Sequence, residues 1–282
     1  MKKLVFFVFV ALLTMSLEAQ IQTPAPSPGA TLKQTVGLTE VTVEYSRPSM
    51  RGRTIFGDLV PYDALWRTGA NKNTTITFSD DVVVEGKELK AGSYAIFTRP
   101  GEAVWEVIFY SDTENWGTPQ EWDASKVAAT VKVEVYAMPM PIETFTMSID
   151  HLYNDGATLG ILWEKVYVGV KFQVPTVAKA TKSIETAMTG TDVSANDYYA
   201  AASYYYSEGM NLTSAKEWIE KAVSMNDKGF WMMRMQSLIY AKMGDTKGAI
   251  EAARKSMAVA EEEGNSDYVK LNKDSLKEWG AM

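Results

Sequence analysis

Residues 46–73 read SRPSMRGRTIFGDLVPYDALWRTGANKN and interrupt the alternating pattern of apolar and polar residues on both sides of them. Glycine or proline stands at four positions before Trp66 (Pro48, Gly52, Gly57 and Pro61). These residues break regular structure, so we expect a long loop that holds at most one short helix, within residues 54–65. Seven aromatic or aliphatic side chains between Ile55 and Trp66 indicate that the loop is packed rather than disordered.

Strand signals lie on both sides of this loop. Residues 38–45 place Val41, Val43 and Tyr45 on one face, which is typical of a half-buried strand. Further strands are expected at residues 74–78, 82–85, 93–98, 104–110, 127–136, 144–153, 158–163 and 166–172. Short strands at this spacing predict an antiparallel β-sandwich, residues 31–175, whose two sheets share a core that includes Trp105 and Trp163.

Three separated motifs carry a resemblance to a known family. The run from Arg47 to Gly101, the segment WEVIFYSDTENWG at residues 105–117 and the segment ILWEKVYVGV at residues 161–170 resemble the bacterial family named domain of unknown function 2911. The resemblance covers about residues 22–174. It implies a secreted or envelope protein of Gram-negative bacteria with a mostly β fold. It implies no established activity, so no catalytic residue is carried over from the family.

The composition changes after Val174-Pro175, where alanine, methionine, lysine and glutamate become frequent and the apolar period becomes helical. We expect a linker over residues 176–195 with a helix at 177–188. A self-match at a spacing of 34 residues follows, in which Tyr206 aligns with Tyr240 and Ala215 with Ala249. The pattern resembles two tetratricopeptide repeats, about residues 196–229 and 230–263, within a helical domain over residues 196–282 that ends in a helix at 267–279.

The N-terminus has the three parts of a secretory signal. Lys2 and Lys3 precede ten apolar residues, Leu4–Leu13, and Leu17-Glu18-Ala19 precedes a cleavage site. We predict a signal peptide over residues 1–19, cleavage near Ala19, export to the periplasm or the medium, and an extended, solvated, proline-rich leader over residues 20–30. The alternative is an uncleaved membrane anchor. No later segment approaches the ~20 apolar residues of a membrane helix, so we expect no stable membrane insertion.

Composition excludes several classes of function. Removal of Lys2, Lys3 and Glu18 with the signal leaves 26 basic and 34 acidic residues, a net charge of −8, which argues against nucleic acid as a partner. The absence of cysteine excludes disulfides, thiol catalysis and cysteine-ligated metals. His151 is the single histidine, so multi-histidine metal sites are excluded and we expect it to be structural. We predict no catalytic residue, no metal and no cofactor.

The first candidate ligand-binding group lies in the loop at residues 46–73. Its members are Arg47, Arg51, Arg53, Trp66, Arg67 and Asn71. Guanidinium groups suit the planar oxygens of a carboxylate, a phosphate or an acidic sugar. In the alternative, Arg47 and Arg67 pair with internal carboxylates and hold the loop against the sheets. We expect this alternative, since buried arginines are usually paired. Arg67→Ala would then cost ~3–5 kcal/mol.

The second group lies in the loop SDTENWGTPQEWD at residues 111–123, which carries Trp116 and Trp122. Exposed indoles beside carboxylates would suit a carbohydrate platform. The alternative, which we expect, is that both indoles cover one end of the sandwich. Glu114 with Glu121, or Asp112 with Asp123, would make a glycosidase pair only with a specific separation and one raised pKa, and the sequence establishes neither.

Together these patterns predict a multi-domain β + α protein without enzymatic activity. The β-sandwich would bind an anionic small molecule or a glycan, and the helical repeats would bind a protein or peptide partner. The alternative is a carbohydrate-binding or glycan-hydrolysing envelope protein that uses the sandwich loops. Convergence of Arg47, Arg67, Trp116 and Glu114 in one open cleft would favour that alternative.

Overall fold

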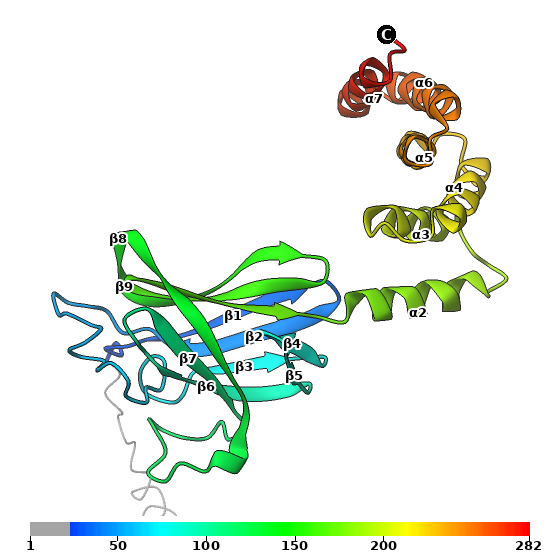
Figure 1. Cartoon of the computed structure of the whole chain (residues 1–282). Coiled ribbons are helices and arrows are strands. Elements are labelled where there is room, and N and C mark those ends of the chain that lie inside the picture. Colours follow the sequence, from blue (N-terminus) through cyan, green and yellow to red (C-terminus); the bar gives the residue numbers. More distant parts are fainter. Residues whose placement is uncertain (1–22) are drawn as a thin grey trace, which may run out of the picture. The chain divides into compact units, whose positions relative to one another are not determined.

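The computed structural model describes residues 23–282, so the predicted signal peptide and its cleavage site lie outside the described residues. The chain divides into two compact units, one ending at Val177 and one spanning Ala178–Met282. The first unit is built from β-strands and the second from α-helices (Figure 1). The β-then-α order predicted from the sequence is therefore confirmed.

The strands of the first unit form one continuous antiparallel sheet. Its nine strands, counted over the described residues, follow the order β1-β2-β3-β6-β7-β8-β9-β4-β5. Their bounds are β1 (Gly29–Val36), β2 (Thr39–Ser46), β3 (Thr75–Phe78), β4 (Val82–Val84), β5 (Lys87–Leu89), β6 (Gly92–Arg99), β7 (Val104–Tyr110), β8 (Val127–Tyr153) and β9 (Gly156–Gln173). A short 3₁₀ helix, η1 (Ala124–Lys126), precedes β8.

Strand β8 joins the two halves of this sheet. Its first part, residues 127–134, pairs with β7, and its second part, residues 135–153, pairs with β9 (Figure 1). The expected strands at 127–136 and 144–153 are thus one strand. The register with β9 shifts between Ala137 and Ile142, around two prolines that cannot donate to a strand ladder. This interruption is what made one strand look like two in the sequence.

Side chains from both halves of the sheet pack into one core. Val43 of β2 and Ile76 of β3 are fully buried in the same cluster as Phe145 of β8 and Ile161 of β9. The rings of Phe78 and Phe172 lie 5.6 Å apart, although β3 and β9 are not neighbours in the sheet. The sheet therefore folds over itself and encloses its apolar face.

Strand β1 was not predicted from the sequence. It pairs with β2 along its whole length, from Gly29↔Ser46 to Val36↔Thr39, and it begins inside the predicted leader. Only Val36 of this strand is fully buried, so its apolar alternation is weak. β5 was missed because two of its three residues, Lys87 and Glu88, are charged and exposed, so it has no apolar alternation. An edge strand gains much of its stability from backbone pairing, which a side-chain pattern does not report.

The loop at residues 46–73 contains turns and isolated bridges, as predicted for a long loop, and residues 54–65 form no helix. Phe56 bridges Val60, and Trp66 bridges Thr98 of β6. Ile55, Phe56 and Val60 are buried in the core of the first unit, as expected for a packed loop. The side chain of Glu164 in β9 accepts a hydrogen bond from Phe56 N at 3.3 Å and so fixes the loop to the sheet.

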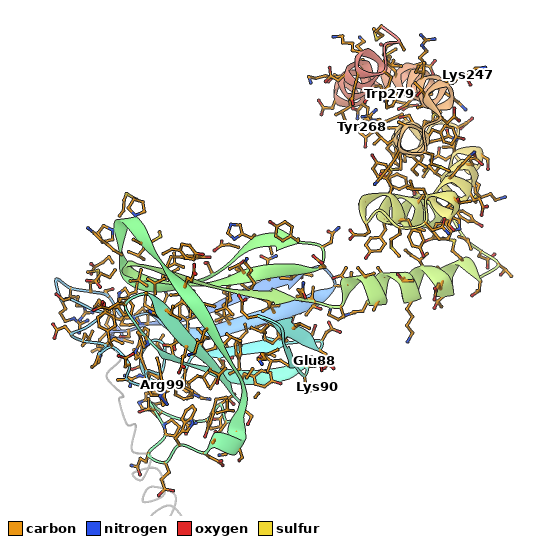
Figure 2. All side chains as sticks on the ribbon, in the orientation of Figure 1. Glu88, Lys90, Arg99, Lys247, Tyr268 and Trp279 are labelled. Carbon is orange, nitrogen blue, oxygen red and sulfur yellow. The ribbon has the colours of Figure 1, made fainter. Side chains whose placement is uncertain are left out.

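Six helices follow the sheet: α2 (Thr176–Met188), α3 (Ala195–Ser207), α4 (Leu212–Met225), α5 (Phe230–Lys242), α6 (Thr246–Glu262) and α7 (Ser266–Glu278). Small side chains such as Ala215 and Ala249 are fully buried where helices approach one another. Tyr268 of α7, labelled in Figure 2, packs against Phe230 of α5 with ring centroids 4.9 Å apart. Within residues 23–282, no helix has the length and apolar content needed to cross a membrane.

Candidate functional site

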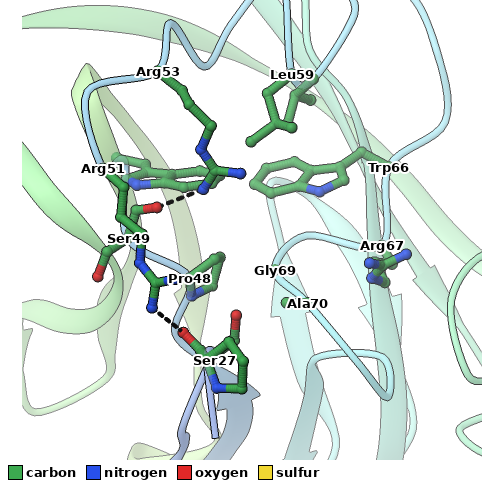
Figure 3. Close-up of a pocket in the computed structure, with 13 residues that line it drawn as sticks. Ser27, Pro48, Ser49, Arg51, Arg53, Leu59, Trp66, Arg67, Gly69 and Ala70 are labelled. Carbon is green, nitrogen blue, oxygen red and sulfur yellow. Dashed lines mark hydrogen bonds between the residues drawn. The ribbon is translucent and has the colours of Figure 1, made fainter.

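A cavity of about 360 Å³ lies in the first unit between the loop at 46–73, the leader and β9 (Figure 3). Its lining includes three arginines, Arg51, Arg53 and Arg67, and two indoles, Trp66 and Trp163. Ser27 and Ser49 add hydroxyl groups, and none of the described lining residues is acidic. Both the size and the mixture of aromatic walls with a few polar groups are typical of a small-molecule site.

Trp66 and Arg67 are held in place by the sheet. Trp66 N donates to Thr98 O at 2.8 Å, and Thr98 N donates to Trp66 O at 2.9 Å. The Trp66 indole stacks on Trp163 with centroids 6.0 Å apart and meets Phe145 edge-on at 5.5 Å. The wall of the cavity that carries Arg67 is therefore fixed by main-chain hydrogen bonds and by ring packing.

The leader forms another wall of the cavity, although most of its described residues are exposed, as predicted for a solvated segment. Pro26 O accepts a hydrogen bond from Arg51 Nη2 at 3.1 Å, and Ser27 O accepts from Asn71 Nδ2 at 3.1 Å. Pro28 O accepts from Arg47 N at 2.9 Å. The candidate residue Asn71 therefore ties down the leader rather than lining the cavity.

The lining arginines have few partners of their own. Arg53 donates from Nε to Met50 O at 2.8 Å and from Nη2 to Ser49 O at 2.6 Å, and Arg51 donates to Pro26 O. Arg67 Nε is buried and has no hydrogen-bond partner. Within residues 23–282, none of the three forms an ion pair. Arg51 and Arg53 are exposed, so solvent screens their charges, and no carboxylate of the described residues pairs with them.

The expectation that Arg47 and Arg67 pair with carboxylates is wrong. Arg47 does hold the loop, but through Phe145 O at 3.0 Å and Thr146 Oγ1 at 2.9 Å. Arg67 has no ion pair within the described residues and is among the residues that line the cavity. The carboxylate of Glu143 does contact the loop, but it accepts from the backbone N–H of Arg51 at 2.8 Å rather than from a guanidinium group.

The two candidate tryptophans of the loop at 111–123 differ from one another. Trp122 stacks on Tyr110 with centroids 4.5 Å apart and meets Phe97 at 5.5 Å, so it covers a small satellite core as expected. Trp116 is 77 % exposed, which corrects the expectation that it covers the sandwich. Neither lines the cavity, so the candidate residues do not converge in one cleft.

The acidic residues beside these tryptophans are engaged in pairs. Asp112 Oδ2 lies 2.7 Å from Lys126 Nζ, and this hydrogen bond lowers the pKa of Asp112. The hydrogen bond from the Ser125 hydroxyl likewise lowers the pKa of Asp123. Glu114 pairs with Lys72 at 3.0 Å. A glycosidase acid needs a raised pKa, so the arrangement makes neither aspartate a general acid.

Sequence reasoning missed Ser27, Ser49 and Trp163 as cavity residues. Ser49 lies inside the arginine-rich loop, so its position there was an available signal. Ser27 and Trp163 are far apart in the chain. They line the same cavity only because the folded sheet brings the leader and β9 to the loop at 46–73. As for metals, no group of three or more His, Cys, Asp or Glu side chains in the described part of the chain is placed to hold an ion.

Comparison with known proteins identifies the family. Residues 27–172, just over half of the chain, match the profile of a family described as Protein of unknown function (DUF2911). No protein of curated function and no solved structure matches the chain. The match includes the sheet, the loop at 46–73 and all but one of the residues that line the cavity. On this match, the chain belongs to the DUF2911 family.

Proposed function

We propose that the first unit binds an anionic small molecule in the cavity, without catalysis. The observation that carries the proposal is the grouping of Arg51, Arg53 and Arg67 in one cavity of about 360 Å³ without an ion pair. A guanidinium group presents parallel N–H donors that match the two oxygens of a carboxylate or the oxygens of a phosphate. A ligand with such a group would place a negative charge beside these three arginines.

Two features support binding over a purely structural role. Arg53 is anchored by two backbone carbonyls, so its orientation is set before a ligand arrives and little side-chain entropy is lost on binding. The indoles of Trp66 and Trp163 exclude water from one side, which strengthens the attraction between guanidinium and carboxylate.

Calorimetric titration of the full mature chain with citrate, glucuronate and phosphate tests this function. We expect at least one of these anions to bind, and Arg53→Gln to weaken its affinity about tenfold or more. The matched control is Arg99→Gln, because Arg99 lies on β6 outside the cavity and pairs with Glu106 at 3.8 Å (Figure 2). Absence of binding by the unmodified chain, or equal losses in both variants, would contradict the proposal.

We also propose that the protein is exported and that its helices bind a protein or peptide partner. The N-terminal signal pattern supports export, and cleavage after Ala19 would leave Gln20–Ala25 before the leader residues that form the cavity wall. Intact mass of the protein from an envelope fraction tests this, since retention of Met1–Ala19 would refute cleavage.

The partner proposal is supported by the helical hairpins α3–α4 and α5–α6, which follow the 34-residue self-match. We infer that they are tetratricopeptide-like repeats and that the folded sheet is a β-sandwich. Selection of peptides against residues 178–282, with residues 20–177 as the control, tests the partner. Enrichment of the same peptides on both fragments would argue against a partner specific to the helices.

A further inference from the structure

We infer that the anion is one acidic sugar of an oligosaccharide whose neighbouring sugar stacks on Trp116. This inference rests on the proposed anion binding in the cavity. It adds a second contact surface, the exposed indole of Trp116, and it narrows the ligand from any small anion to a saccharide that carries a carboxylate.

The first observation is the exposure of Trp116. Its side chain is 77 % exposed, and it makes no aromatic or cation–π contact with another described residue. Trp122, six positions later, is stacked on Tyr110 instead. A bare indole presents a flat apolar face with a polar N–H edge, and the apolar C–H face of a sugar ring is complementary to such a surface.

The second observation is that the backbone under Trp116 is anchored. Lys72 and Trp116 form an antiparallel bridge, and Asn73 N donates to Asn115 O at 3.1 Å. The ion pair between Lys72 and Glu114, at 3.0 Å, supports the same segment. The backbone that carries the Trp116 indole is therefore held at a fixed position in the loop at residues 111–123, which reduces the entropy lost when a ligand binds.

The third observation connects this indole with the cavity. Arg67 lines the cavity, and its Nη1 lies 3.5 Å from the position that a Cβ atom on Gly117 would occupy. The guanidinium of Arg67, a residue that lines the cavity, therefore lies beside the backbone next to Trp116. A ligand whose carboxylate binds Arg67 would have its neighbouring group close to Trp116, and in an oligosaccharide that group is a second sugar ring.

The charge around Trp116 favours a saccharide over an acidic peptide. Glu114 and Asp112 are each paired with a lysine, Lys72 and Lys126, so these two carboxylates add no net charge to the platform. Glu121 remains as an exposed carboxylate in the same loop. A chain of like negative charges would gain nothing there, whereas a sugar ring gains a stacking contact. Inside the cavity, the hydroxyl of Ser27 is suited to a sugar hydroxyl group, whereas that of Ser49 is hydrogen-bonded to Thr144 Oγ1 at 3.0 Å.

Calorimetry on the full mature chain with glucuronic acid, aldotriouronic acid (a trisaccharide of one glucuronic acid and two neutral xyloses) and hexaglutamate tests the inference. We expect the trisaccharide to bind about tenfold more tightly than the monosaccharide. Trp116→Ala should remove this gain and leave the affinity for the monosaccharide unchanged. The matched control is Tyr153→Ala, which removes another exposed aromatic side chain of the same unit, at 67 % exposure, and should change neither affinity.

The outcomes separate the two proposals. Binding of glucuronic acid, citrate or phosphate, with an affinity for the trisaccharide that does not depend on Trp116, would overturn the inference and leave anion binding standing. Hexaglutamate that binds more tightly than the trisaccharide would also overturn it, in favour of an acidic peptide. Failure of every anion to bind would overturn anion binding itself.

Discussion

Arg67 and Arg47 belong to the same loop but have opposite roles. The guanidinium of Arg47 donates to Phe145 O and Thr146 Oγ1 and so ties the loop to β8. Arg67 lines the cavity, and its buried Nε has no partner. A buried donor without an acceptor lowers the stability of the ligand-free protein. A ligand that accepts a hydrogen bond from Arg67 would remove this cost.

At the residue scale, we expect Arg67→Met to raise the free energy of unfolding or to lower it by less than ~0.5 kcal/mol, because an unpaired donor is removed, no hydrogen bond of the described structure is lost and the apolar stem is kept. Arg47→Met should lower it by ~1–3 kcal/mol, because two acceptors lose their donor. Urea denaturation with and without citrate measures both. A loss of ~3 kcal/mol in Arg67→Met would show instead that Arg67 is a structural residue.

Tyr240 provides a prediction of pH dependence. Its hydroxyl donates to Glu220 Oε1 at 2.6 Å, and burial together with this bond raises the pKa of Tyr240 from 10.0 to about 12. The unfolded chain then loses the phenol proton first, so this contribution to stability is complete below about pH 10 and is lost as the pH rises toward about 12.

We therefore expect the stability difference between the unmodified chain and Tyr240→Phe to be constant below about pH 10 and to shrink up to about pH 12. Urea denaturation followed by circular dichroism at several pH values measures this difference. The other tyrosines are the same in both chains, so their contributions cancel. Tyr136→Phe is the control, because Tyr136 is more exposed and contacts Glu134 at 3.5 Å. A difference that stays constant through this range would contradict the assignment.

At the element scale, the turn between β1 and β2 is tightly enclosed. Gly37 has φ +55°, and a Cβ atom there would overlap Thr176 Oγ1 and Asn154 O. The turn, the β8–β9 hairpin and the start of α2 therefore meet at a point that only glycine fits. Gly52, in the loop at 46–73, also has a positive φ, +75°, but a Cβ atom there would meet nothing within 4 Å.

Both glycines have a positive φ, but only Gly37 is enclosed by neighbouring atoms, so their alanine variants form a matched pair. We expect Gly52→Ala to cost ~1 kcal/mol, from the left-handed backbone alone. Gly37→Ala should cost ~3 kcal/mol or more, since Asn154 O belongs to the backbone and must move. Thermal melts of the two variants test this. Equal losses would mean that the turn adapts without strain.

At the scale of the whole molecule, the cores of the two units share no residue. The apolar clusters of the first unit lie within residues 30–174, and the cluster of the second unit lies within residues 184–239. We expect residues 20–177 to fold alone with a β spectrum and residues 178–282 to give a helical one. Circular dichroism of the two fragments measures this. A disordered spectrum for the first fragment would mean that its core needs the helices.

Much of this architecture follows from local patterns in the sequence. The two helices with predicted bounds, 177–188 and 267–279, lie within one residue of α2 and α7, because helical periodicity and turn residues mark both ends of each element. Alternation located β2, β3, β6 and β7 for the same reason. β1 was missed because an exposed edge strand has little apolar alternation. The two parts of β8 were separated because its prolines interrupt the pattern but not the strand.

For the candidate site, the sequence alone determined that arginines and a tryptophan are concentrated in one packed loop. Only the tertiary structure decided which arginine holds the loop and which ones line the cavity, and which of Trp116 and Trp122 is exposed. The physical reason is distance along the chain. Ser27, Arg67 and Trp163 become neighbours only when β1 pairs with β2 and the sheet folds over the loop, and no local pattern encodes that contact.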